Sequence, residues 1–134
     1  MRTSFTVSTT LPAEPERVFR TWLSTEGHAA MTGSPAKVQP RVGGNFSAWD
    51  GYITGKTLAL RPYSRIVQSW RTSDFSAADP DSQIEVVIEP AEAGALLTLT
   101  HTGIPEGQAE SYESGWEESY FVPMREYFAK SPDR

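Results

Sequence analysis

The sequence predicts an α+β domain in which a curved antiparallel sheet of six to seven strands lies against one long C-terminal helix, with two short helices after the first strand. Three observations support this class. Residues 2–10 alternate like a half-buried strand, residues 36–103 form short extended runs between turn residues, and residues 108–130 carry an apolar stripe at helical spacing. Because the links between the runs are short, consecutive strands should pair antiparallel.

Two short helices are expected directly after the first strand. Pro15 fits the first turn of a helix that continues to Leu23, because a proline at that position removes no helical hydrogen bond. Ser24 is a suitable N-cap for a second helix, and Gly33 is a suitable end for it.

The predicted strands cover residues 45–49, 52–60, 65–72, 83–89 and 95–102. Asp50-Gly51 is the strongest hairpin signal, and it fixes the register of the first two of these strands. In the third, Ile66, Gln68 and Trp70 share the face expected to point inward. The polar Gln68 leaves two alternatives: the register is opposite, or the interior contains a hydrogen-bonding group.

The last helix should dock on the sheet through an aromatic stripe, while glutamates occupy its opposite side near the N-terminal end. Pro123 falls inside this helix, so we expect a kink there, because proline lacks an N–H group and its ring clashes with the carbonyl four residues earlier. The stripe consists of Tyr112, Trp116, Ser119, Tyr120, Pro123, Met124 and Tyr127.

Composition excludes several function classes. The 134 residues contain no cysteine, so no disulfide or thiolate site is expected. A catalytic zinc site needs three protein ligands, and with only two histidines in the chain no metal site is expected. A net charge of −5 disfavours nucleic acid as a partner. Without a long apolar run or a signal peptide, membrane insertion is not expected and the predicted location is cytoplasmic. No motif indicates a cofactor.

Several segments, taken in their order and spacing, resemble the bacterial members of the activator of heat-shock protein 90 ATPase homologue family, which belongs to the START-like (SRPBCC, helix-grip) superfamily. The resemblance covers residues 5–128, and we expect 1–134 to form a single START-like domain. It implies an apolar cavity between the sheet and the C-terminal helix. The segments that carry it are Gly43 to Gly51, Gly55-Lys56, Arg65 to Arg71, Leu99 to Gly103 and Gly115-Trp116.

The resemblance implies a partner less clearly than it implies a fold. The eukaryotic co-chaperones that give the family its name have an additional N-terminal domain that makes the main contact with the chaperone, and this chain is similar to their C-terminal domain. Stimulation of a heat-shock-protein ATPase in a stress response is therefore an alternative function rather than the leading one.

The leading hypothesis is a domain that binds a small hydrophobic ligand, such as a lipid, sterol or polyketide-like molecule, without evident catalysis. His101 continues the inward face of its strand, as either a core histidine or the polar group that orients a ligand. Cyclase-type or hydrolase-type chemistry with His101 as base is a further alternative. The predicted cavity residues are Phe46, Gln68, Trp70, Val86, Leu99, His101, Trp116 and Tyr120.

Overall fold

The computed structural model describes residues 3–130 and confirms the predicted α+β class. The helical segments are α1 (Pro15–Trp22), α2 (Thr25–Thr32), α3 (Ala109–Gly115), the π-helical η1 (Trp116–Phe121) and α4 (Val122–Lys130). The strands are β1 (Phe5–Leu11), β2 (Lys37–Val38), β3 (Asn45–Ala48), β4 (Ile53–Arg61), β5 (Arg65–Thr72), β6 (Ser82–Ala91) and β7 (Gly94–Thr102).

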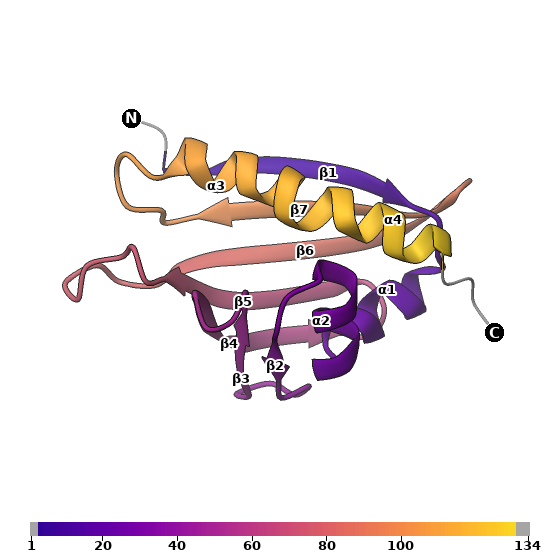
Figure 1. Cartoon of the computed structure of the whole chain (residues 1–134), viewed down its shortest axis with the longest axis horizontal. Helices are drawn as coiled ribbons and strands as arrows, with labels where there is room; N and C mark the ends of the chain where they lie inside the picture. The colour runs from indigo at the N-terminus through magenta and orange to yellow at the C-terminus, as the bar shows by residue number, and fades with distance from the viewer. Residues whose placement is uncertain (1–2, 131–134) are drawn as a thin grey trace.

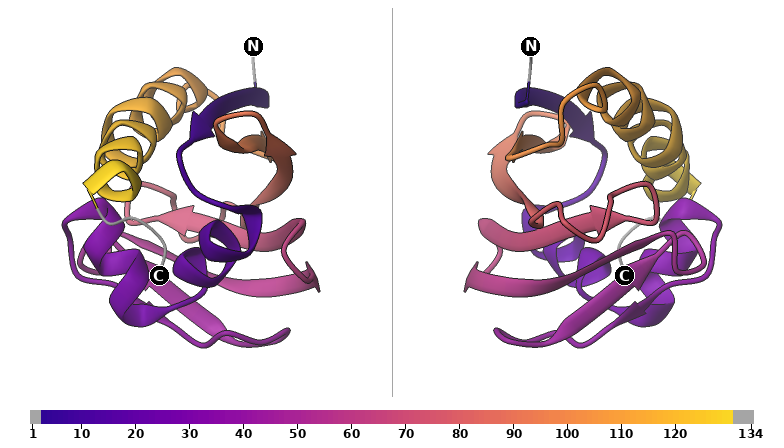
Figure 2. Two further views of the ribbon diagram at one scale, coloured as in Figure 1. Left: turned by 90° about the vertical axis from the view of Figure 1, so that its right-hand side faces the viewer. Right: turned by 90° about the vertical axis from the view of Figure 1, so that its left-hand side faces the viewer.

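The seven strands form one antiparallel sheet in the order β1-β7-β6-β5-β4-β3-β2. Every link except the one from β1 to β2 joins neighbouring strands, as the short connections predict, and α1 and α2 occupy that exception. The sheet curves, and the long helix lies across its open side with α1 and α2 beside it (Figures 1 and 2). The register shifts between Thr57 and Ala59, a β-bulge that bends β4.

The two short helices begin where predicted, and the first ends at Trp22, one residue before the predicted Leu23. Pro15 is the first residue of α1. The Ser24 side chain caps α2 by accepting a hydrogen bond from the Gly27 amide at 3.0 Å, and Gly33 ends the helix in a left-handed conformation with φ of 80°. Thr25 also joins α2 to the sheet, because its hydroxyl accepts from the Val38 amide at 2.8 Å and donates to the Val38 carbonyl.

The turn at Asp50-Gly51 joins β3 to β4, as predicted, and places Phe46 opposite Gly55. Three consecutive residues, Trp49, Asp50 and Gly51, have positive φ angles of 51°, 56° and 87°. At Gly55 a methyl group would overlap the Ser69 carbonyl oxygen and would lie 2.6 Å from the Phe46 ring. Glycine therefore lets β4 approach β5 closely at this point while the phenylalanine ring covers the gap.

The long helix accommodates Pro123 through a π-helical turn that the sequence did not predict. In η1 the Val122 amide bonds to the Glu117 carbonyl five residues earlier, and this wider turn immediately precedes the proline. The extra residue in this turn rotates the side chains that follow it about the helix axis. Phe121 and Phe128 are therefore fully buried, whereas the predicted stripe members Ser119, Pro123 and Tyr127 are half-buried.

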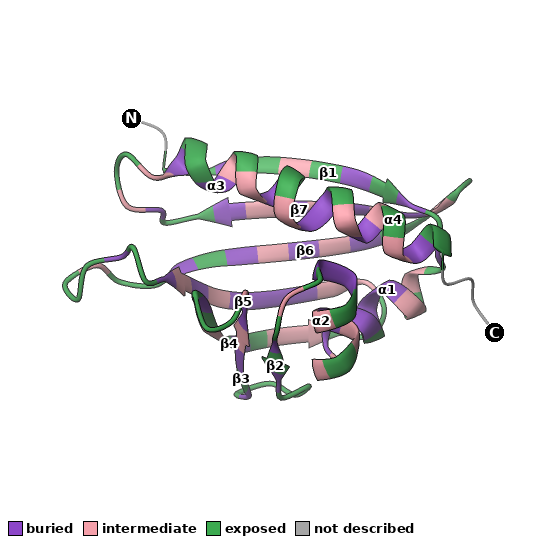
Figure 3. Ribbon diagram, in the orientation of Figure 1, coloured by how far each residue is buried: buried purple, intermediate pink, exposed green. Residues whose placement is uncertain are grey.

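The core lies between the concave side of the sheet and the helices, whose outer sides are exposed (Figure 3). On β5 the structure decides between the two alternatives for Gln68. Its side chain is 1% exposed and shares the interior with Ile66 and Trp70, so the register is as predicted and the interior does contain a hydrogen-bonding group.

Candidate functional site

The centre of the core is a cluster of large aromatic rings from α1, β5 and the long helix. Trp116 lies at the centre of this cluster. Its ring centroid is 4.7 Å from that of Tyr120, 5.7 Å from that of Trp70 and 6.3 Å from that of Trp22, the last in a stacked arrangement. Such contacts add to the burial of apolar area and fix the ring orientations. The π-helical turn begins at Trp116 and ends after Tyr120, so it positions both rings in this cluster.

A chain of four groups satisfies His101 completely in its neutral form. The Trp116 indole N–H donates to His101 Nδ1 at 3.1 Å, so the imidazole proton lies on Nε2. Nε2 lies 2.9 Å from Ser82 Oγ and donates to it, and that hydroxyl donates to the Trp70 carbonyl at 2.6 Å. A proton added at Nδ1 would face the indole N–H, donor against donor.

His28 is the centre of a second chain of the same kind. Its Nδ1–H donates to the Trp22 carbonyl at 2.8 Å, so Nε2 is the acceptor for the Tyr120 hydroxyl at 2.7 Å. The Trp22 indole donates to Gln68 Oε1 at 3.2 Å, and the Gln68 amide donates to Thr57. The two chains meet in the aromatic cluster, because Tyr120 and Trp116 are in contact there.

Burial shifts the pKa values of these groups away from the charged form. It lowers the pKa of His101 from 6.5 to about 3. Burial also lowers the pKa of His28 to about 4, against the opposing effect of the Trp22 carbonyl, which stabilises the protonated ring. The pKa of Tyr120 is raised well above its ordinary value, again by burial. All three groups are neutral near pH 7.

A cavity of about 80 Å³ lies between the aromatic cluster and the β3–β4 turn. It has room for a few water molecules at about 30 Å³ each. Two polar atoms on its lining residues, the indole nitrogens of Trp49 and Trp70, are buried and have no hydrogen-bond partner in the described part of the chain. The lining residues are Trp49, Tyr52, Ile53, Trp70, Tyr112, Gly115, Trp116, Ser119 and Tyr120.

The eight predicted cavity residues lie at or beside the cavity, in the packed core, or, for Phe46, on β3. Trp70, Trp116 and Tyr120 line the cavity, and His101 touches it indirectly through its contacts with Trp70 and Trp116. Gln68, Val86 and Leu99 are buried in the packed core, with Val86 and Leu99 paired across β6 and β7. Phe46 lies at the other end of the sheet, over Gly55.

Two residues of the site were not among the predicted cavity residues: Trp49 at the β3–β4 turn and His28 on α2. Trp49 adjoins the Asp50-Gly51 signal, where a tryptophan next to a tight turn could have indicated a cavity wall. His28 had no such signal, because its partners Trp22 and Tyr120 come from both ends of the chain. Within residues 3–130, no cluster of histidine and carboxylate side chains could hold a metal ion, and no helix is long and apolar enough to cross a membrane.

We expect Trp116→Phe to destabilise the fold more than Trp70→Phe does. The two changes remove similar ring area, but the first also removes the donor to buried His101 Nδ1, and an unsatisfied buried acceptor costs about 1–3 kcal/mol. The Trp70 indole N–H has no partner among the described residues, so its loss breaks no hydrogen bond. Urea unfolding of both variants measures the difference, and equal losses would contradict the assigned bond.

The curved sheet closed by one long helix defines a helix-grip domain of the START-like type. Residues 12–129 match the family described as "Activator of Hsp90 ATPase homolog 1-like protein", so the chain belongs to this family. This confirms the resemblance found in the sequence. A solved structure of an HSP90 activator from Plasmodium falciparum is similar over 99% of this chain and 100% of its own, with a TM-score of 0.86 and 26% identity.

The chain is also similar to a longer human protein and to a bacterial protein of about its own length. The human activator of 90 kDa heat shock protein ATPase homolog 1 is 27% identical over 123 residues, which are 92% of this chain and 36% of the human protein. A protein from Chromobacterium violaceum has a TM-score of 0.78 at 29% identity, covering 99% of this chain and 100% of its own. The chain therefore spans about a third of the length of these curated relatives.

Proposed function

We propose that the protein binds a cytosolic chaperone of the Hsp90 class and stimulates its ATPase. The observation that carries this proposal is the similarity to the Plasmodium falciparum HSP90 activator over essentially the full length of both chains. A domain of this size thus carries the activator name in another organism. The proposal reverses the order of the two leading hypotheses drawn from the sequence.

The packing of the interior supports the same choice. Pockets that bind drug-sized molecules measure about 300–1,000 Å³. The cavity under the long helix is about 80 Å³, because the four rings of the aromatic cluster and the two histidine chains fill the space that a lipid or sterol would need. Recognition of a protein on the outer surface requires no such space.

The direct test is the ATPase rate of the host's own Hsp90-class chaperone, measured with and without the purified protein. We expect the rate to rise by roughly fivefold or more at saturation, a typical size for coupling between two sites. A sample of the protein unfolded by heat serves as the control. An unchanged rate under conditions where binding is detected would overturn stimulation.

A second candidate is binding of a small, mainly apolar ligand that carries a hydrogen-bond acceptor. The observation in its favour is the pair of unpartnered indole N–H groups, on Trp49 and Trp70, beside the cavity. A ligand larger than the cavity would require α2 or the loop at residues 73–81 to move, as lids do in other binding proteins. Gln68, Val86, Leu99 and His101 would then form the deeper wall.

Native mass spectrometry of freshly purified protein, followed by thermal-shift screening of lipids, sterols, flavonoids and polyketides, tests this candidate. A bound ligand should raise the melting temperature of the wild type. Gly115→Leu provides a control, because Gly115 lines the cavity and a Cβ there meets no heavy atom within 4 Å, so we expect the leucine side chain to take up cavity space. A shift that persists in Gly115→Leu would place the ligand elsewhere.

His101 is poorly suited to serve as a general base. Trp116 and Ser82 occupy both of its ring nitrogens, and burial lowers its pKa to about 3, so it takes up a proton weakly near pH 7. The cyclase or hydrolase alternative would need Trp116 to release Nδ1, and this would expose the most central ring of the core.

A further inference from the structure

Cations on the described surface of this acidic protein fall into two groups according to whether they have a carboxylate partner. Arg20, Arg65, Arg71 and Arg125 each form an ion pair, with nitrogen to oxygen distances of 2.6–2.8 Å. Among the described residues, Lys37, Arg41, Lys56 and Arg61 form none, and all four are exposed. All four lie on β2, β4 or the loop after β2, and within residues 3–130 Lys130 is the one other exposed cation without an ion pair.

Strand pairing brings these cations onto one surface. Lys37 pairs with Ser47, which pairs with Thr54, and Lys56 follows two residues later on the same side of β4. That side is opposite to the buried Phe46 and Ile53, so it is the outer face of the sheet. After the bulge, Arg61 also lies on the outer face, because its neighbour Leu60 pairs with fully buried Ile66.

Exposed apolar side chains lie among the cations. The amides of Gly43 and Thr57 bond to the carbonyls of Thr57 and Gly44, at 2.8 and 2.9 Å. These bonds hold the loop that carries Val42 beside β4, next to Leu58. Val42 is 57% exposed and Leu58 is 46% exposed, and both rank among the few large hydrophobic side chains on the described surface.

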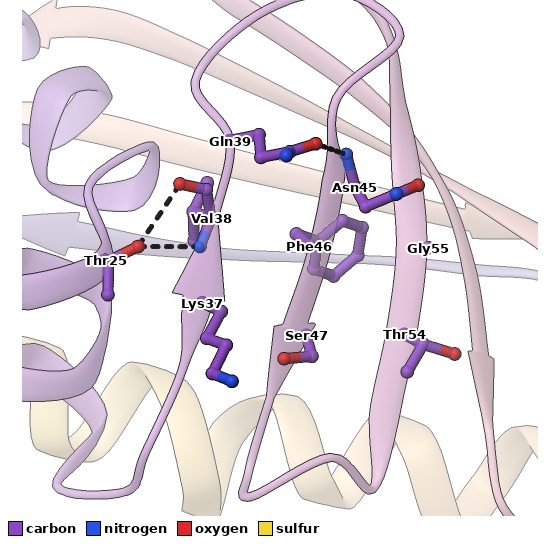
Figure 4. A pocket seen from close by; sticks show the side chains of 9 residues that line it. All are labelled: Thr25, Lys37, Val38, Gln39, Asn45, Phe46, Ser47, Thr54 and Gly55. Carbon is purple, nitrogen blue, oxygen red and sulfur yellow. Dashed lines mark hydrogen bonds between the residues drawn. The ribbon is translucent and has the colours of Figure 1, made fainter.

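The same face is hollowed by an open groove of about 650 Å³ (Figure 4). Lys37, Ser47 and Thr54 of the outer face line it, and Thr25, Val38 and the Phe46–Gly55 pair, which belong to the opposite side of these strands, complete its wall. The neighbouring edge of the sheet is closed, because Thr25 already bonds both the amide and the carbonyl of Val38. A partner would therefore dock on the face rather than add a strand at this edge.

We propose that the outer face of β2–β4, formed by Lys37, Arg41, Val42, Lys56, Leu58 and Arg61 and here called the β2–β4 surface, docks an acidic segment of a partner protein. This rests on the proposed function and identifies the side of the domain that meets the chaperone. Charge complementarity selects a carboxylate-bearing partner. The exposed Val42 and Leu58 select a protein over a phosphate backbone, which offers no apolar side chains.

The negative charge of the long helix would orient the domain as it meets its partner. Glu106, Glu110 and Glu118 are exposed on and before the long helix, whereas Glu117 pairs with Arg125, and within residues 105–121 the chain has no cation. An acidic partner is repelled from that side and attracted to the β2–β4 surface, so the domain approaches in one orientation. This effect weakens as salt screens the charges.

Lys56→Glu tests the surface, and Lys130→Glu is its matched control, because both replace an exposed lysine without an ion pair and change the net charge equally. With the host chaperone as ligand, we expect Lys56→Glu to weaken the affinity by roughly fivefold and to flatten its salt dependence. Lys130→Glu should leave both unchanged, and equal effects of the two variants would overturn the proposal. Thermal unfolding of each variant shows that it remains folded.

Amide chemical-shift mapping separates the failure of this surface from the failure of the chaperone role. The titrants are the host chaperone, a synthetic peptide of glutamates and leucines, a DNA duplex and phosphatidylserine vesicles. Shifts at residues 37–61 with chaperone and peptide support the proposal. If only the peptide shifts these residues, the surface stands and the chaperone role falls. Shifts elsewhere with the chaperone overturn the surface alone, and preference for DNA or vesicles overturns the protein partner.

Discussion

Gly55→Ala is expected to prevent stable folding of the domain, a loss of more than about 4 kcal/mol. The added methyl group would overlap the Ser69 carbonyl oxygen, which cannot withdraw without breaking the pairing of β4 with β5, and it would also press against the Phe46 ring. Because the obstacle is backbone rather than a flexible side chain, the strand itself must move. Circular dichroism and urea unfolding measure the loss.

Gly115→Ala is the matched control for this prediction. The same methyl group at Gly115 has no heavy atom within 4 Å, and Gly115 is helical without a positive φ angle. Alanine should therefore stabilise the domain by up to about 1 kcal/mol through its higher helix propensity. If both glycines tolerated alanine equally, the close approach of β4 and β5 at Gly55 would be wrong.

Acidification is expected to destabilise the fold strongly below pH 6.5 through His28 and His101. The folded pKa values are about 4 and about 3, whereas the unfolded chain titrates near 6.5. Between these values the unfolded state binds more protons, so the free energy of unfolding falls as the pH falls, by about 1.4 kcal/mol per pH unit for each histidine. The contribution of the two histidines to the free energy of unfolding is fully present above pH 6.5 and is lost as the pH falls toward their folded-state pKa values.

Equilibrium unfolding at several pH values, compared with His28→Gln and His101→Gln, isolates this effect. Each variant should be less stable than the wild type at pH 7, because a buried hydrogen-bond chain is broken. Each should then lose less stability on acidification, since one titrating group is gone. A wild type whose free energy of unfolding is the same at pH 7 and pH 4 would show that the histidines are not held neutral.

Local sequence signals predicted most of the fold, because the features involved lie close together in the chain. Ser24 and Gly33 cap α2 as their residue types predict, and Asp50-Gly51 forms the expected turn. The π-helical turn before Pro123 was not predictable in this way. A proline indicates an interruption, but whether the helix kinks or widens depends on the packing of Trp116 and Phe121 against the sheet.

The candidate site was less predictable than the fold, since its bonds join distant segments. Alternation placed Gln68 and His101 inward correctly, yet the identity of their partners depends on how the long helix sits over the sheet. The exposed cations illustrate the same difficulty. In the sequence Lys37, Arg41, Lys56 and Arg61 are isolated single charges, and only the pairing of β2, β3 and β4 brings them onto one face.

The closure of the β2 edge by Thr25 also directs how copies of this protein would aggregate. An open sheet has two edge strands, and unpaired edges attract strands from other molecules. At β2 a single hydroxyl already satisfies Val38, whereas the β1 sequence from Phe5 to Leu11 has neither charge nor proline to repel a second copy. We therefore expect copies that do associate to do so through β1 rather than β2, and Ser8→Lys should oppose this association.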